Sequence, residues 1–368
     1  MTGSERGRTM TRLATAETGQ DDAAARQDSG SGIRSVGVRR AIRAASRPGQ
    51  WKRGPVLAAS ALLLGLFMLL HARITDFGGL GSLVETFLPW FGLFVPVLLA
   101  WALWRRSPSA VVALLLPAVV WLNLFGGLLG DRSHPGGDLT VAQHNVGEGN
   151  PDPVGTARDL AASGADVLAL VELTHQARGT YEKELAEAYP YHTVQGTVGL
   201  WSKLPLSDTR PVDTRMDYGP LGDTKPAEVK MAYNRALRTT VATDQGPLAV
   251  YAAHLGSVRL MPRGGFWTDS RDRNAQALGE ALAAERNERV VLLGDLNGTT
   301  DDRAFAGITS LMRSAQDEAG DGFGFTWPAK FPVVRIDQIL VRGVEPQSSW
   351  VLPATGSDHL PVAARISW

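Results

Sequence analysis

The chain has 368 residues, no net formal charge and no cysteine. The absence of cysteine excludes disulfides, thiol nucleophiles and cysteine-ligated zinc sites. The zero net charge conceals two opposite parts: residues 1–53 carry eleven Lys/Arg against five Asp/Glu, whereas residues 138–368 carry 22 against 29. An acidic C-terminal part is poorly suited to gripping a polyphosphate backbone, so we expect no stable nucleic-acid partner.

The N-terminal third contains no pattern of a folded soluble domain. Residues 1–53 are rich in Ser, Gly, Thr, Arg, Asp and Gln without apolar periodicity, which predicts a disordered basic arm. Three long apolar stretches follow, and their lengths predict transmembrane helices at about 55–71, 79–104 and 109–130. Glu85 is the one acid in these stretches, and we expect it at a membrane surface.

The basic residues around the apolar stretches predict an orientation. The arm before the first stretch is rich in arginine, and the short link after the second holds Arg105 and Arg106. The positive-inside rule therefore predicts a multi-pass protein of the cell membrane with a cytoplasmic N-terminus. After three spans, the domain at 138–368 would face away from the cytoplasm.

From about Asp138 the pattern changes to short apolar runs broken by turns. Expected strands are 138–146, 165–173, 198–202, 235–243, 248–255, 288–297, 331–343 and 361–368. Expected helices are 154–163, 178–188 and 269–285. Since strands outnumber helices and several are joined as hairpins, we predict an α/β fold in which helices flank a two-sheet β-sandwich.

Polar side chains gather where the predicted strands end: Asn145, Glu172, His254, Asp295, Asn297, Asp337, Asp358 and His359. Each alone has an ordinary interpretation as a turn residue, an exposed charge, a cap or a core histidine. Together they favour one site at the strand ends, where loops present function. A carboxylate beside an imidazole can hold a water for attack on phosphorus, so the pattern predicts a metal-assisted phosphoester hydrolase.

The order of these residues resembles the DNase I-like endonuclease/exonuclease/phosphatase superfamily. The resemblance rests on GDLN ending at Asn297, on Ser357-Asp358-His359 and on GLWSKLPL at 199–206, and it covers about residues 138–368. Leu296 stands where phenylalanine is common in that superfamily, a departure that we expect to be harmless. The resemblance implies a DNase I-like sandwich and hydrolysis of a phosphoester or phosphoanhydride.

The resemblance also implies residue roles. A Mg²⁺ or Mn²⁺ ion would be held by Asn145, Glu172 and Asp358. The catalytic set would be His254, Asp295, Asn297, Asp337, Asp358 and His359. Within it, His359 and Asp295 would activate and position the water, and Asn297 and His254 would donate to the transition state. Which of Asp295 and His359 takes the proton stays open.

The substrate is less defined by sequence. Trp267 and Trp327 lie in aromatic, glycine-containing stretches and are candidates for substrate contact, while Arg271 is expected on a solvated helix face. A membrane-tethered acidic domain favours a lipid-linked phosphate; the alternatives are a tethered extracellular nuclease and an inactive membrane-anchored scaffold. The layout resembles membrane-anchored superfamily members of high-GC Gram-positive bacteria that are linked with teicoplanin resistance.

Overall fold

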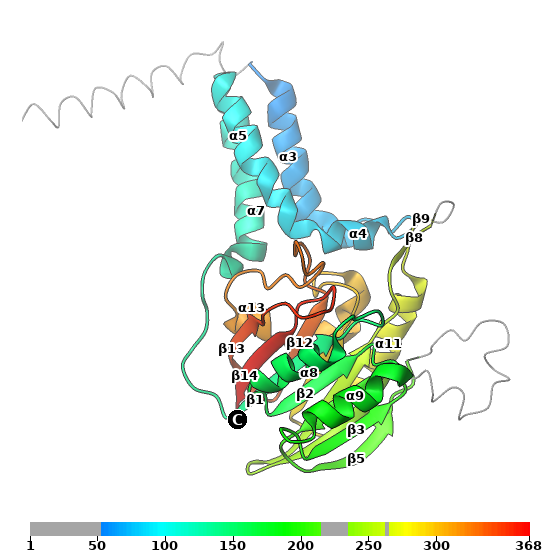
Figure 1. Ribbon diagram of the computed structural model, residues 1–368. Coiled ribbons are helices and arrows are strands. Elements are labelled where there is room, and N and C mark those ends of the chain that lie inside the picture. Colours follow the sequence, from blue (N-terminus) through cyan, green and yellow to red (C-terminus); the bar gives the residue numbers. More distant parts are fainter. Residues whose placement is uncertain (1–52, 215–234, 262–264) are drawn as a thin grey trace, which may run out of the picture.

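The computed structural model of the protein describes residues 53–214, 235–261 and 265–368. Apart from Arg53, the predicted basic arm lies outside these residues. An apolar helical module, residues 54–130, stands on a larger sandwich domain, residues 138–368 (Figure 1). The chain therefore divides where the sequence pattern changes from long apolar stretches to short ones.

The helical module consists of α3 (Pro55–Leu70), η1 (His71–Arg73), α4 (Leu80–Thr86), η2 (Leu88–Leu93), α5 (Phe94–Trp104), α6 (Pro108–Ala113), α7 (Leu115–Phe125) and η3 (Gly126–Leu129). Two stretches, Pro55–Arg73 and Pro108–Leu129, are each long and apolar enough to cross a membrane. The middle stretch counts as a third only across a bend of 66° between α4 and the helices that follow it.

That bend differs from the straight span expected at 79–104. Pro89 is the second residue of η2, and a proline lacks the N–H that would continue a helix from α4. As a result α5 runs beside α3 and α7, while α4 lies across the end of the sandwich domain (Figure 1).

Two six-stranded mixed sheets form the sandwich, which confirms the predicted fold. The first sheet has the order β13-β14-β1-β2-β4-β3 and the second the order β11-β12-β10-β7-β6-β5. In each sheet the central pair is parallel, β1 with β2 and β10 with β7. The strand ends of both central pairs carry the polar residues of interest.

The first sheet contains β1 (Leu139–Asn145), β2 (Val167–Val171), β3 (Tyr191–Gln195), β4 (Val198–Ser202), β13 (Glu345–Val351) and β14 (Val362–Ser367). The second contains β5 (Leu206–Pro211), β6 (Ala236–Thr243), β7 (Gly246–His254), β10 (Val290–Asp295), β11 (Arg313–Ser314) and β12 (Asp337–Arg342). A separate hairpin pairs β8 (Arg259–Met261) with β9 (Gly265–Trp267). The helices are α8 (Pro153–Ala162), α9 (His175–Leu185), α11 (Asp269–Ala283), η5 (Arg303–Phe305), α12 (Ala306–Thr309) and α13 (Ala315–Ala319).

Strand β10 shows why the central strands are apolar along their whole length. Val291 and Leu293 pack between the two sheets, whereas Val290 and Leu292 pack under α11 on the outer face. Side chains alternate between the faces of a strand, so a strand covered on both faces needs apolar residues at every position. Gly294 interrupts this run because a Cβ there would lie 1.9 Å from the carbonyl oxygen of Ala253.

Some elements differ from the sequence prediction. Strands β3, β5 and β13 were not expected, and each carries exposed or half-buried residues without a clear apolar period. The strand expected from residue 331 begins only at Asp337. Before it, the N–H groups of Val333 and Val334 both bond to the carbonyl of Trp327, so that segment folds back on its own loop.

Candidate active site

The polar residues predicted at the strand ends meet at one end of the sandwich. The parallel register sets Asp295 of β10 opposite His254 of β7, and Asn145 of β1 opposite the last residue of β2. Glu172 follows β2 directly, in a left-handed conformation with φ 58°. Asn145, His254 and Asp295 are all almost fully buried. Packing of the two sheets against each other then joins Asn145 of the first sheet to Asp295 of the second, 150 positions apart.

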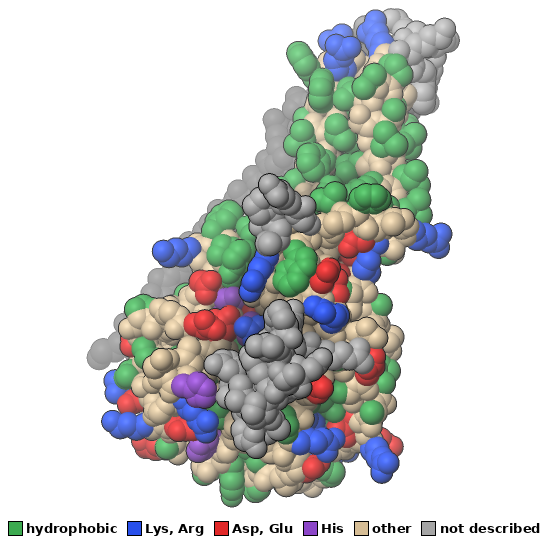
Figure 2. All heavy atoms as spheres, turned by 90° about the vertical axis from the view of Figure 1, so that its right-hand side faces the viewer, with side chains coloured by type: hydrophobic (Ala, Val, Ile, Leu, Met, Phe, Trp, Pro, Cys, Tyr) green, Lys and Arg blue, Asp and Glu red, His purple; other side chains and the backbone are tan. Residues whose placement is uncertain are grey.

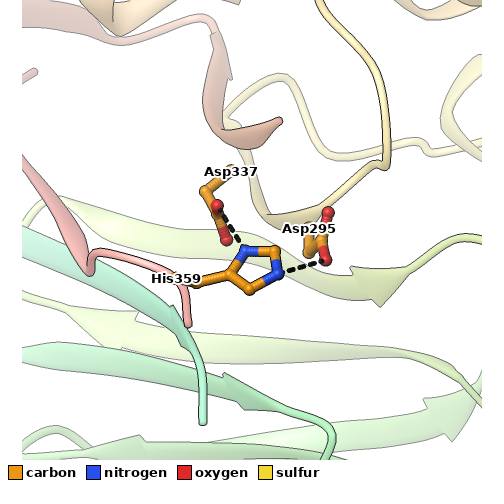
Figure 3. A group of neighbouring side chains, drawn as sticks. All are labelled: Asp295, Asp337 and His359. Carbon is orange, nitrogen blue, oxygen red and sulfur yellow. Dashed lines mark hydrogen bonds and ion pairs between the residues drawn. The ribbon is translucent and has the colours of Figure 1, made fainter. Parts of the chain in front are cut away.

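His359 lies between two aspartates (Figure 3). Its Nδ1 is 2.8 Å from Asp337 Oδ2 and its Nε2 is 3.8 Å from Asp295 Oδ2. Asn145 donates from Nδ2 to the same oxygen of Asp295 at 3.0 Å. Asp295 and Asp337 face each other on adjacent antiparallel strands. Four residues from both sheets therefore form one hydrogen-bonded group.

The charges in this group shift its titration. Burial alone disfavours the imidazolium, but the negative charges of Asp337 and Asp295 outweigh it and raise the pKa of His359 to about 9. Burial, together with the charge of Asp337, raises the pKa of Asp295. His359 is therefore cationic at neutral pH when no other cation is near, and Asp337 fixes its ring orientation.

His254 has buried nitrogens that lack partners. Neither Nδ1 nor Nε2 has a hydrogen-bond partner among the described residues, although Nε2 lies 3.5 Å from Glu172 Oε1 and 3.8 Å from Asp295 Oδ2. Burial, reinforced by the positive charges of Arg235 and His359, holds the pKa of His254 well below its usual value. A neutral imidazole with a free N–H is suited to donate to an incoming anionic oxygen.

Asn297 and Asp358 lie at the edge of the group formed by Asn145, Asp295, Asp337 and His359, Asn297 bonded to Asp295 and Asp358 exposed. Asn297 has φ 52°, and its N–H donates to Asp295 Oδ1 at 2.9 Å, which fixes the carboxylate. Its Nδ2 donates one hydrogen to the carbonyl of Leu255 and keeps a second for another acceptor. Asp358 is exposed and accepts a 3.3 Å hydrogen bond from Trp327 Nε1.

Two groups of residues could hold a cation. Asp295, Asp337 and His359 offer ligand atoms within 4.8 Å of one another. However, the imidazolium of His359 already pairs with one of these carboxylates, that of Asp337. Glu172 is 23% exposed, with Oε2 accepting from the N–H of Glu148 at 3.1 Å. Asn145 is paired in register with Val171, the residue before Glu172. A carboxylate that lacks a cationic partner among the described residues suits the oxygen-preferring Mg²⁺.

The two candidate tryptophans lie in different places. Trp327 is 37% exposed and touches Asp358 directly. Trp267 belongs to the β8–β9 hairpin, which packs against α4. Among the described residues no hydrogen bond or ion pair joins Trp267 to the catalytic set. Only Trp327 is brought to the site by a described contact.

Gln143 was missed by the sequence analysis. It lies in β1, is fully buried, and donates from Nε2 to Asp337 Oδ1 at 2.7 Å. The signal was present in the sequence, because an uncharged amide inside an apolar strand needs a buried partner. Asp337 therefore accepts from Gln143 with one oxygen and bonds His359 with the other.

Comparisons with known proteins agree with this arrangement. A family model described as Endonuclease/Exonuclease/phosphatase family matches residues 142–359. A functionally unknown conserved protein from Enterococcus faecalis V583 superposes with a TM-score of 0.50 at 15% identity, covering 62% of this chain and 99% of that chain. A humanized D. rerio TDP2 superposes with a TM-score of 0.50 at 18% identity, with the same coverage of 62% and 99%. No curated protein matched the chain.

The likeness to the two solved structures concerns the fold, and it covers 62% of this chain in each case. The family match begins in β1 and ends at His359, so it contains every residue of the predicted catalytic set. It also spans more than half of the chain. The chain belongs to the Endonuclease/Exonuclease/phosphatase family and is a metal-dependent phosphoric ester hydrolase.

Proposed function

We propose that the protein is a membrane-anchored, extracytoplasmic phosphoesterase that hydrolyses a phosphoester or pyrophosphate bond of a lipid-linked substrate. The observation that carries this proposal is a loop that touches both the active site and the helical module. We name residues 323–334 the aromatic loop.

On the module side, the aromatic loop packs against η2 and α7. Trp90 of η2 stacks on Phe325 with ring centroids 5.6 Å apart, and its Nε1 donates to the carbonyl of Val333 at 2.8 Å. Phe323 packs against Trp121 and Phe125 of α7. Aromatic residues are enriched where membrane and water meet, so this contact is suited to the membrane surface.

On the site side, the same loop contacts the segment that carries Asp358 and His359. The N–H of Ala329 donates to the carbonyl of Asp358 at 2.7 Å, and the N–H of Leu360 donates to Thr326 at 2.9 Å. Phe331 is 73% exposed. A substrate whose apolar part stays in the bilayer could thus present its phosphate to a site held close to the helical module.

The surface of the module supports a membrane environment. Figure 2 shows hydrophobic side chains over the helices and Lys and Arg side chains at the end remote from the sandwich domain. Arg53, Arg105 and Arg106 line a hollow at that end. The arginines lie at this end of the module, and the catalytic residues lie in the domain at the other end. The positive-inside rule requires this distribution for an extracytoplasmic site.

The proposed chemistry uses the residues at the strand ends. Asp337 holds His359 so that its Nε2 faces Asp295. Asp295 and His359 position the attacking water, and the one of the two that is unprotonated takes its proton. His254 and the free amide hydrogen of Asn297 donate to the oxygens of the pentacoordinate transition state. Glu172 and Asn145, with Asp358 at the rim, would hold Mg²⁺ or Mn²⁺. When bound, the ion neutralises charge on the phosphate and the leaving group.

The test uses the full chain in proteoliposomes with Mg²⁺ or Mn²⁺. Polyprenyl phosphates and pyrophosphates, phospholipids, sphingomyelin, plasmid DNA and RNA are offered in parallel. His359→Ala is the inactive variant, and Asp244→Asn, at an exposed turn between β6 and β7, is the matched control. Release of phosphate or of a phosphorylated head group from a lipid, lost only in His359→Ala, supports the proposal.

The other outcomes separate the alternatives. Cleavage of DNA or RNA alone would make the protein a tethered nuclease and overturn the lipid proposal. No turnover together with no divalent-cation binding would favour a scaffold, although all predicted catalytic positions are present in this chain. A role in glycopeptide resistance stays a prediction from layout, to be tested by deleting the gene and measuring teicoplanin susceptibility.

A further inference from the structure

Helix α4 presents two buried polar side chains to the sandwich domain. Ser82 is 2% exposed and Glu85 is not exposed at all. The sequence predicted that Glu85 would lie at a membrane surface, but the structure buries it at a protein interface. A fully buried carboxylate on a short apolar helix is destabilising unless a cation and hydrogen-bond donors satisfy it.

Arg303, the first residue of η5, satisfies Glu85. Its Nη2 donates to Glu85 Oε1 at 2.7 Å, its Nε to Oε2 at 3.1 Å, and its backbone N–H also to Oε2 at 3.0 Å. This fork geometry is the strong form of an arginine–carboxylate pair. His71 adds a contact of 3.3 Å to Glu85 Oε1.

Ser82 makes a second contact between α4 and the sandwich domain, with Asp302, the residue before Arg303. Its hydroxyl donates to Asp302 Oδ2, and the same oxygen lies 2.9 Å from Arg271 Nη1. The side chains of Arg271 and Asp302 are both fully buried. Arg271 was expected on a solvated helix face; instead its charge requires the buried Asp302 as a partner.

Arg271 continues the link to the active site. Its Nη1 donates to the carbonyl of Asn297 at 3.4 Å, and its guanidinium lies over the ring of Phe305 at 5.3 Å. Asn297 fixes Asp295 through its backbone N–H. A continuous path of contacts therefore runs from Ser82 through Asp302 and Arg271 to the loop that positions Asp295.

We propose that α4 is a positioning element of the active site, with Ser82 and Glu85 holding the segment 297–305 in its catalytic arrangement. The helical module would then serve catalysis as well as anchoring. A displacement of about 1 Å in a positioned group can lower a rate on the order of a hundredfold. The proposal requires only phosphoesterase activity and holds for lipid-linked and soluble substrates alike.

The experiment uses the full chain in nanodiscs with a soluble chromogenic phosphodiester, which separates this proposal from the identity of the natural substrate. The variants are Ser82→Ala and Glu85→Gln. The controls are Ser109→Ala, at the far end of the module, and Glu318→Gln, which removes an exposed ion pair with Arg313. We measure kcat, KM and hydrogen exchange of the amides in 297–305.

We expect both variants to lose roughly 10- to 100-fold in kcat with little change in KM, and to exchange faster at 297–305 while the core strands stay protected. The controls should match the unmodified chain. Unchanged kcat in well-folded Ser82→Ala would overturn the proposal, as would faster exchange without any loss of kcat. If Glu85→Gln does not fold, Ser82→Ala alone decides, because it removes a single hydroxyl.

Discussion

Gln143 and Asp337 come from different sheets and are joined by a 2.7 Å hydrogen bond from the amide Nε2 to the carboxylate Oδ1. The second oxygen of Asp337 bonds His359. Gln143 therefore decides which way the carboxylate faces, and through it the orientation of the imidazole. Gln143 thus acts on His359 only through Asp337, as a positioning residue.

Replacing Gln143 by leucine should lower kcat about tenfold or more, because a buried carboxylate loses a hydrogen bond worth roughly 1.5–3 kcal/mol. KM should change little, since Gln143 does not face the substrate. Steady-state kinetics of Gln143→Leu, with Gln276→Leu on the exposed face of α11 as control, measures the effect. A variant with unchanged kcat would remove Gln143 from the positioning role.

Replacing Asp337 by asparagine should lower kcat on the order of a hundredfold or more, the usual contribution of a positioned acid–base group. Asparagine keeps the size of the side chain but loses the charge that stabilises the imidazolium of His359. The kinetics of Asp337→Asn are compared with those of Asp244→Asn. Equal losses in both variants would show that the effect is not specific to the site.

Asp295→Asn should stabilise the metal-free protein in a pH-dependent way. The pKa of Asp295 is raised to about 7 in the folded state, above its ordinary value of 3.8, so the folded state binds the proton more tightly than the unfolded state. The resulting destabilisation is absent below pH 3.8 and reaches its full size above about pH 7. The asparagine variant removes it.

Melting temperatures in EDTA at several pH values test this prediction. We expect Asp295→Asn to melt at higher temperature than the unmodified chain at pH 8, and the difference to shrink as the pH falls toward 4. Activity should be lost at every pH. A constant difference across the whole range would mean that the charge of Asp295 is not the cause.

Glu172→Gln should raise the Mg²⁺ concentration needed for half-maximal activity by about tenfold or more, because a charged oxygen ligand becomes a neutral one. Titration of activity with Mg²⁺ measures this, and Glu318→Gln is the control. Excess Mg²⁺ should restore part of the rate. An unchanged Mg²⁺ requirement would move the ion to another set of ligands.

Trp327→Ala should raise KM for a lipid substrate about tenfold, the value of one buried aromatic contact, without affecting a soluble phosphodiester. Trp327 borders Asp358 and is part of the aromatic loop. Trp267→Ala is the comparison, since Trp267 lies in the hairpin beside α4. Equal effects of the two variants on both substrates would argue against a substrate contact by Trp327.

The sequence analysis was most successful where a polar residue ends an apolar run. Asp295 and Asn145 were located because each closes a buried strand, and packing of the two sheets then brings these two strand ends together. It failed for β3 and β5, whose exposed residues leave no apolar period. Strand pairing for these edges depends on neighbours distant in the chain, which local patterns do not encode.

The sequence prediction was also wrong for the middle part of the helical module, for a different reason. Hydropathy treats 79–104 as one apolar stretch, because it averages over Glu85 and Pro89. The bend follows from Pro89, whereas the burial of Glu85 depends on Arg303, a partner 218 positions later in the chain. A single acid in an apolar stretch could have suggested a buried partner, but nothing in the sequence singles out Arg303.

The position of β14 at the C-terminal side of the catalytic residues matters for truncated forms of the protein. The strand joins β13 to β1, and its residues follow every member of the catalytic set in the chain. A premature stop codon at Pro361 would leave the whole set encoded, yet remove the strand that supplies buried Ala364 and Ile366 to the interior. A survey by sequence motif would count such an allele as intact, whereas the fold makes it a null allele.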